Sequence, residues 1–180
     1  MGAGASQNHV HCHAWPNPPV GASGYAAEAA AALASDAFET YVLRGADGAA
    51  YGSVQSEGHR LDAALLDYPC ACVRLRSQDP LLLGKGLGAV VAALQGDDLP
   101  HNVCALGGDV YVFARRRERA PGLPSRLGAS EMMGTFHCAS RSELDAAATP
   151  GAMAEALAAV SAPREATWAT ALAALARDLH

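Results

Sequence analysis

The feature that most constrains the fold is a β-hairpin signal in the middle of the chain. Two apolar runs, Asn102 to Leu106 and Val110 to Ala114, flank the sequence Gly107-Gly108-Asp109. Glycine adopts positive φ angles without steric cost, so this pair predicts a tight turn between two antiparallel strands. A fold built around the hairpin must contain an antiparallel sheet.

A strand and a helix are predicted before the hairpin. Leu65 to Arg76 is rich in strand-forming residues and is broken early by Pro69. The glycine-rich residues 84–88 resemble a phosphate loop only loosely, and we expect a turn there. An amphipathic helix follows, because four apolar residues recur at helical spacing: Leu87, Val90, Val91 and Leu94.

More helix than strand is predicted after the hairpin. Glu131 to Ala139 is expected to be a strand or an extended segment. One helix is predicted to begin at 142–148 and to run on over 151–160, and a second to cover Arg164 to Leu179 with Pro163 at its start. The pattern predicts an α+β fold with helices packed on an antiparallel sheet.

Length and composition fit a single domain over residues 1–180. Half of the residues are apolar, so a core can form. Residues 20–60 are biased toward Ala and Gly, and we expect an insertion or linker there, with a short helix over 26–37 and a loop over 45–58.

Charge and hydropathy exclude some classes of function. The net charge of −5 argues against a general nucleic-acid binder, which needs a basic surface. The chain has no apolar run of about 18 residues, so no membrane span is predicted. Five cysteines, an odd number without framework spacing, indicate free thiols in a reducing compartment, and we expect a cytoplasmic location.

Three histidines alternate along a predicted strand near the N-terminus: His9, His11 and His13. Alternate residues of a strand face the same side, so a strand over Ser6 to Trp15 presents the three imidazoles together. A neutral imidazole can attack phosphorus and form a phosphoramidate, while its neighbours donate to phosphate oxygens and protonate the leaving group. A metal site and a polar surface strand are the alternatives.

The wider segment resembles a known family. Residues Met1 to His11 place a run of small residues before Ser6-Gln7-Asn8 and the histidine pair. This order is similar to that in the GDP-hexose phosphorylases of the histidine-triad superfamily, which include GDP-L-galactose and GDP-D-glucose phosphorylases. Weaker matches follow in the same order as in the family: 66–69, 99–103, 112–115, and Glu131 with Gly134 as a Glu-x-x-Gly motif.

The resemblance implies a fold, a reaction and roles for particular residues. The fold would be that of the histidine-triad and galactose-1-phosphate uridylyltransferase group. The reaction would convert GDP-hexose and inorganic phosphate to GDP and hexose 1-phosphate, without a metal or cofactor. His11 would be the nucleophile, and His9 and His13 would support it. The substrate contacts carried over are Ser6, Asn8, Asn102 and Arg115.

The chain also departs from the family pattern. Plant-type members tend to carry Gln at the position of His13, whereas animal-type members and the simple triad hydrolases carry His. The hexose, and hydrolysis as an alternative to phosphorolysis, therefore remain open. Thr135 stands where the family often has His. Family members have a long region before the triad, so we expect the fold to be incomplete at its N-terminus. The expected protein partner is a second copy or a missing N-terminal half, and an inactive truncated domain is the non-enzymatic alternative.

Overall fold

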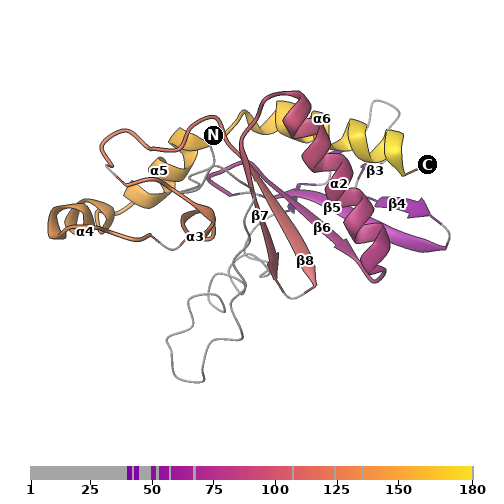
Figure 1. The fold of residues 1–180 in the computed structure, drawn as a ribbon, viewed down its shortest axis with the longest axis horizontal. Helices are drawn as coiled ribbons and strands as arrows, with labels where there is room; N and C mark the ends of the chain where they lie inside the picture. Colours follow the sequence, from indigo (N-terminus) through magenta and orange to yellow (C-terminus); the bar gives the residue numbers. More distant parts are fainter. Residues whose placement is uncertain are drawn as a thin grey trace, which may run out of the picture.

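The computed structural model describes residues 40–41, 43–44, 50–51, 53–56, 58–66, 68–106, 108–123, 125–134 and 136–179. These residues form one antiparallel sheet with helices packed on it, together with a small two-stranded ladder (Figure 1). The α+β class and the antiparallel sheet predicted from the sequence are therefore confirmed.

The sheet has five strand positions. The main strands are β5 (His59–Leu66), β6 (Cys72–Ser77), β7 (His101–Leu106) and β8 (Asp109–Ala114). Their order is β5-β6-β8-β7, and every neighbouring pair is antiparallel. On the outer edge of β5, β4 (Ser53–Ser56) pairs with one end and β1 (Thr40–Tyr41) pairs with the other. The separate ladder joins β2 (Leu43–Arg44) to β3 (Ala50–Tyr51).

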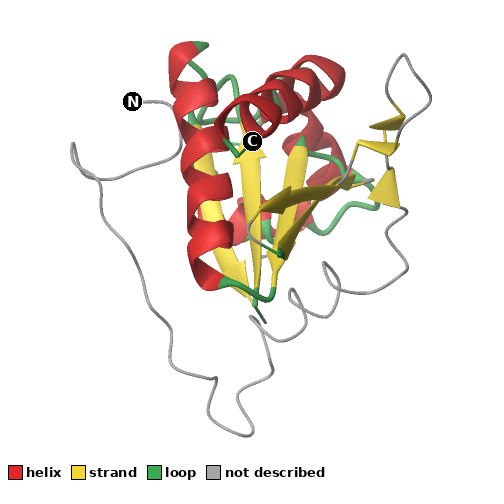
Figure 2. Ribbon diagram, turned by 90° about the vertical axis from the view of Figure 1, so that its right-hand side faces the viewer, coloured by secondary structure: helices red, strands yellow, loops and turns green. Residues whose placement is uncertain are grey.

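The helices fall into two groups. The two long helices are α2 (Pro80–Gly96) and α6 (Arg164–Asp178), which pack against each other and against the sheet. The short helices α3 (Ala129–Met132), α4 (Arg141–Ala147) and α5 (Ala152–Val160) gather at the other end of the molecule, on the left of Figure 1. Figure 2 shows helices lined up along the strands.

The hairpin and the helix before it follow from local sequence signals. The hairpin predicted around residue 107 is β7–β8, and Gly108 has φ +90°. In α2, the Asp79 side chain accepts a hydrogen bond from the Leu81 amide, and Pro80 occupies the first turn. The turn predicted at 84–88 is wrong, because these residues lie inside α2. A Cβ on Gly86 would come within 2.5 Å of the Leu61 side chain, so glycine lets the helix approach β5 closely.

Two further expectations differ from the structure. Residues 53–56, predicted to be loop, form β4, and strands β1 to β4 occupy part of the region expected to be an insertion. β4 and β5 form a local hairpin, in which Ser56 pairs with His59 and Gly58 has φ +82°. Only the pairing of β1 with β5 joins residues far apart in the sequence, which local composition does not encode. No strand forms over the described part of 131–139. Glu131 instead lies in α3, where its carboxylate accepts a hydrogen bond from the Gly128 amide.

The apolar core lies on both faces of the sheet. Between the sheet and helices α2 and α6, alternate residues of β5, β6 and β8 meet the fully buried Trp168 of α6. We call this the helix face. On the opposite face, Tyr111 and Phe113 pack with residues of α3, α5 and the loops beside them. In the part of the chain that the structure describes, no helix is long and apolar enough to cross a membrane.

Candidate functional site

Most of the residues predicted to carry the chemistry lie outside the described part of the chain. These are the predicted nucleophile and its supporting groups, together with two substrate contacts: Ser6, Asn8, His9, His11 and His13. Their roles therefore remain predictions. Two predicted substrate contacts, Asn102 and Arg115, fall within the described residues.

The structure brings Asn102 and Arg115 together. Asn102 lies on β7 and Arg115 directly follows β8, and the guanidinium Nη1 donates to Asn102 Oδ1 at 3.0 Å. The same guanidinium donates to the carbonyl oxygens of Leu127, Arg117 (2.9 Å) and Glu118 (3.1 Å). Arg115 therefore ties the loop after β8 to the sheet edge.

This arrangement uses all the donors at the end of the side chain. Arg115 is fully buried, and both terminal nitrogens make two hydrogen bonds each. Burial lowers the pKa of its guanidinium. Its Nε is buried without a hydrogen-bond partner among the described residues. The contact between Arg115 and substrate stays a prediction, and it would require some of these bonds to open.

A carboxylate–imidazole pair lies beside this anchor. Glu131 is buried, and one of its oxygens lies 2.7 Å from His137 Nδ1. The other oxygen accepts from the Gly128 amide at 2.7 Å and from the Ser130 hydroxyl at 3.0 Å. The His137 side chain is 68% exposed. Glu131 thus fixes the orientation of an imidazole at the surface.

The hydrogen bonds decide the charge of Glu131. Burial alone would raise the pKa of this carboxyl, but the bonds from His137, Gly128 and Ser130 outweigh it and lower the pKa. Glu131 and Gly134 stand out in the sequence as a Glu-x-x-Gly motif, whereas no sequence motif includes His137. The sequence pattern that could have indicated this pair is weak, because it is only an acidic residue six positions before a histidine with a glycine between them. In the structure this glycine, Gly134, has φ +91° and reverses the chain.

A second polar region lies on the sheet surface opposite the helix face. Arg74 and Arg76 of β6 and Asp109 of β8 share this surface, which we call the polar face. Arg76 makes a bidentate pair with Asp109, at 2.7 and 2.6 Å. Arg74 is half-buried. Both arginines occupy β6, the central strand of the sheet.

The buried cysteines are poor nucleophiles. Burial raises the pKa of the Cys70 and Cys104 thiols to about 11, and it also raises the pKa of Cys72. A thiol with such a pKa is protonated at neutral pH and unreactive. All four described cysteines are free. Within the described residues, no group of three or more His, Cys, Asp or Glu side chains could hold a metal ion.

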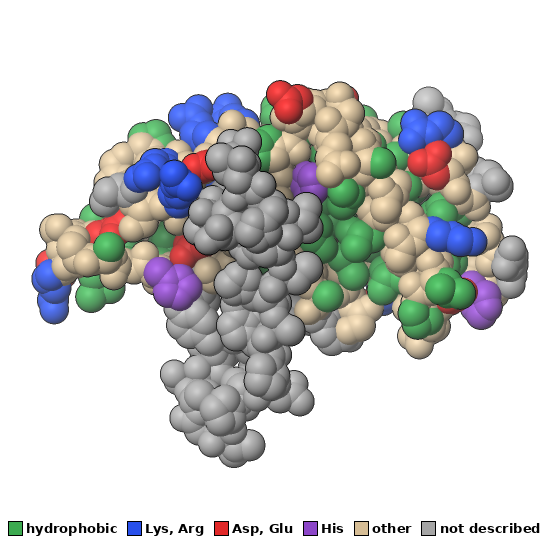
Figure 3. Space-filling view, in the orientation of Figure 1, with side chains coloured by type: hydrophobic (Ala, Val, Ile, Leu, Met, Phe, Trp, Pro, Cys, Tyr) green, Lys and Arg blue, Asp and Glu red, His purple; other side chains and the backbone are tan. Residues whose placement is uncertain are grey.

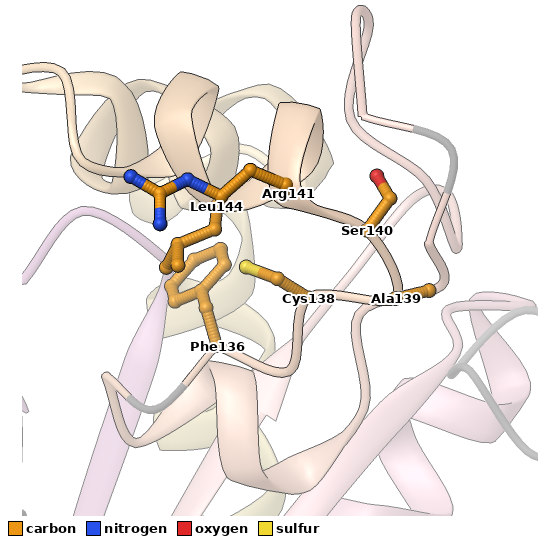
Figure 4. A pocket seen from close by; sticks show the side chains of 6 residues that line it. All are labelled: Phe136, Cys138, Ala139, Ser140, Arg141 and Leu144. Atoms are coloured by element: carbon orange, nitrogen blue, oxygen red, sulfur yellow. The ribbon is translucent and has the colours of Figure 1, made fainter.

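One open hollow lies near α4. It has a volume of about 510 Å³ and is lined by six residues: Phe136, Cys138, Ala139, Ser140, Arg141 and Leu144. The Phe136 ring, the Leu144 side chain and the Cys138 thiol gather on one side, and Arg141 lies above them (Figure 4). On the molecular face in Figure 3, Lys and Arg side chains are scattered and form no continuous basic patch over the described residues.

Comparisons with known proteins give no further guide. No family model, no curated protein and no solved structure matches this chain.

Proposed function

We propose that this protein is a GDP-hexose phosphorylase that works through a guanylyl-His11 intermediate. The observation that carries the proposal is the segment Ser6-Gln7-Asn8-His9-Val10-His11-Cys12-His13, with its three alternating imidazoles after a run of small residues. The proposal includes a fold of the histidine-triad and galactose-1-phosphate uridylyltransferase group, for which the antiparallel sheet with packed helices is a consistent framework.

The described residues support the proposal at three of the family-like motifs. Asn102 and Arg115 come from separate motifs and are hydrogen-bonded to each other. Glu131 and Gly134 form the Glu-x-x-Gly motif, in which Glu131 is buried and Gly134 has a positive φ. These motif positions are ones where the fold demands a particular residue type, as expected if the collinear resemblance has a structural basis.

The reaction proceeds in two displacements at one phosphorus atom. An imidazole nitrogen of His11 attacks the α-phosphorus of GDP-hexose, and the bond from this phosphorus to the bridging oxygen breaks. Hexose 1-phosphate leaves with that electron pair, and His9 or His13 supplies a proton where one is needed. An oxygen of inorganic phosphate then attacks guanylyl-His11, the P–N bond breaks, and GDP forms.

Intact-protein mass spectrometry tests the proposal directly. The purified chain is incubated with GDP-glucose or GDP-L-galactose in phosphate-free buffer, beside the His11→Asn variant. We expect a guanylyl mass adduct on the wild type alone, and release of GDP when phosphate is added. A folded wild-type chain that gains no adduct would contradict the proposal and favour an inactive, truncated domain.

A triad-type hydrolase or phosphoramidase is the second candidate, because the third position of the triad is His13. Simple triad hydrolases carry His at this position. Phosphate dependence separates the two enzymes: a phosphorylase releases GDP only when phosphate is present, whereas a hydrolase releases GMP in its absence.

A further inference from the structure

One arginine on the polar face differs from the others around it. Arg74 lies in the middle of β6, between β5 and β8, directly across from Ala64 and Tyr111. It is half-buried at the centre of a five-position sheet. A guanidinium in such a place loses part of its hydration, which is unfavourable unless a partner replaces the lost water.

The neighbouring arginines have such partners. On the same face, Arg60 pairs with Asp62 at 2.7 Å, and Arg76 pairs with Asp109. Arg115 is bonded to four oxygen atoms. Arg74 has neither a hydrogen bond nor an ion pair with any residue that the structure describes.

The charges around Arg74 favour an anion. Asp62 and Asp109 neutralise Arg60 and Arg76, so these two pairs leave the positive charge of Arg74 uncompensated. Its cross-strand partners on the same face, Ala64 and Tyr111, are uncharged, and the charged neighbour Arg76 is already paired with Asp109. The Tyr111 hydroxyl is buried and donates its proton to Asp109 Oδ2 at 3.4 Å, so it adds no charge beside Arg74.

Position on the sheet points to a ligand surface. Toward one end of the polar face, Leu66, Cys72 and Phe113 belong to an apolar cluster covered by the short helices and nearby loops. Toward the other end lie the ion pairs of Arg60 and Arg76. Arg74 stands at the boundary and keeps part of its surface exposed, so an anionic group of a ligand can reach it.

We propose that Arg74 binds the diphosphate group of a nucleotide. A planar guanidinium donates two parallel hydrogen bonds to phosphate oxygens, and the bond is stronger in a partly dehydrated site. The nucleotide as the source of the diphosphate rests on the proposed function, whereas the anion site itself stands on the geometry of the polar face.

Calorimetric titration tests this site with two probes, inorganic pyrophosphate and GDP. We expect one saturable site on the wild-type chain. Arg74→Met should weaken binding of both probes roughly tenfold or more, because one charge-assisted contact is removed. Arg74→Lys should weaken binding less, because lysine keeps the positive charge but lacks the two parallel N–H donors of the guanidinium. Arg177→Met, at the exposed end of α6, is the matched control and should bind as the wild type does.

A second measurement needs no variant of Arg74. Phenylglyoxal modifies accessible guanidinium groups, and peptide mapping then reports each arginine separately. Bound pyrophosphate should protect Arg74 several-fold and leave Arg177 unprotected. Unchanged modification of Arg74 at saturating pyrophosphate would overturn the proposal, and so would full binding by a folded Arg74→Met chain.

The His11→Asn variant separates this proposal from the proposed function. It should still bind pyrophosphate, although it forms no guanylyl adduct. Binding that depends on Arg74 in a chain that never forms the adduct would support the anion site and contradict the phosphorylase. Pyrophosphate binding that is lost in His11→Asn and kept in Arg74→Met would contradict the Arg74 site.

Discussion

The two faces of the sheet are built from the same strands but carry different kinds of side chain. On the helix face, the central residues of β5, β6 and β8 present apolar side chains to α2 and α6. On the polar face, the alternate residues of the same strands include Asp62, Arg74, Arg76 and Asp109. Neighbouring residues point to opposite faces, so one strand can satisfy both requirements at once.

The difference shows that apolar packing and charged residues are separated between the two faces. The helix face is closed by long helices and contains no charged side chain in its core cluster. The opposite face is apolar only where the short helices and loops cover it, and its charged residues other than Arg74 are held by specific pairs. We therefore expect volume changes to matter most on the first face, and hydrogen bonds and charge on the second.

The largest effect is expected from Trp168→Ala on the helix face. Trp168 is fully buried between α6 and the rest of the core, so its truncation leaves a large cavity. The free energy of unfolding should fall by about 3–5 kcal/mol, measured by urea denaturation followed by circular dichroism. Leu144→Ala, at a half-exposed position on α4, is the control and should change it by less than about 0.5 kcal/mol. A loss below about 1 kcal/mol for Trp168→Ala would show that this face is not tightly packed.

Arg115→Met tests whether hydrogen bonding dominates the other face. The substitution keeps an apolar side chain of similar length but leaves four oxygen acceptors without their donor. We expect a loss of about 2–3 kcal/mol in the free energy of unfolding. Arg115→Lys should restore little of it, because an ammonium cannot reach all four acceptors. Full rescue by lysine would mean that charge alone, rather than the fork of donors, holds the loop.

Glu131→Gln should lower the free energy of unfolding by about 1–2 kcal/mol at neutral pH. The reason is that the bonds from Gly128, Ser130 and His137 are made to a charged group. The folded-state pKa of Glu131 lies below its ordinary value of 4.5. Its contribution is therefore complete above pH 4.5 and is lost as the pH falls through the folded pKa. Urea titrations of the wild type and the variant across this range should show that the difference in their free energies of unfolding becomes smaller on the acidic side only. A difference that stays constant with pH would argue against a charged Glu131.

The smallest effect is expected for Asp109→Asn. It removes the charge that pairs with Arg76, whose side chain is 49% exposed. Solvent screens such a pair, so we expect a loss of no more than about 1 kcal/mol. The difference from the wild type should shrink in 1 M NaCl, since salt screens charges that solvent reaches. A loss that salt does not change would indicate that buried hydrogen bonds, not charge, account for the effect.

Elements with strong local signals were predictable from the sequence. The β7–β8 hairpin was marked by its glycines, the C-terminal part of α2 by apolar spacing, and the start of α6 by Pro163. In each case the residues that determine the element lie within the element itself or next to it.

Features that depend on distant residues were not predictable. Residues 84–88 looked like a turn because of their glycines, yet the contact of Gly86 with Leu61 makes a glycine useful inside α2. Strand β1 forms because the distant end of β5 offers it an edge. In the candidate site, Asn102 and Arg115 were singled out separately, and only the fold shows that they bind each other. Arg74 became a candidate for ligand binding only when the fold placed it on the central strand of the sheet.

The Arg115 anchor has a consequence for proteolysis. The loop that it holds contains Arg116, Arg117, Arg119 and Arg126, all exposed and all trypsin sites by residue type. A protease needs an extended, loosened segment, so exposure of the side chain alone does not lead to cleavage. One guanidinium bonded to Arg117, Glu118 and Leu127 keeps this segment folded back on the sheet. The rate of tryptic cleavage in this loop therefore measures how often the hydrogen bonds of Arg115 open while the sheet stays intact.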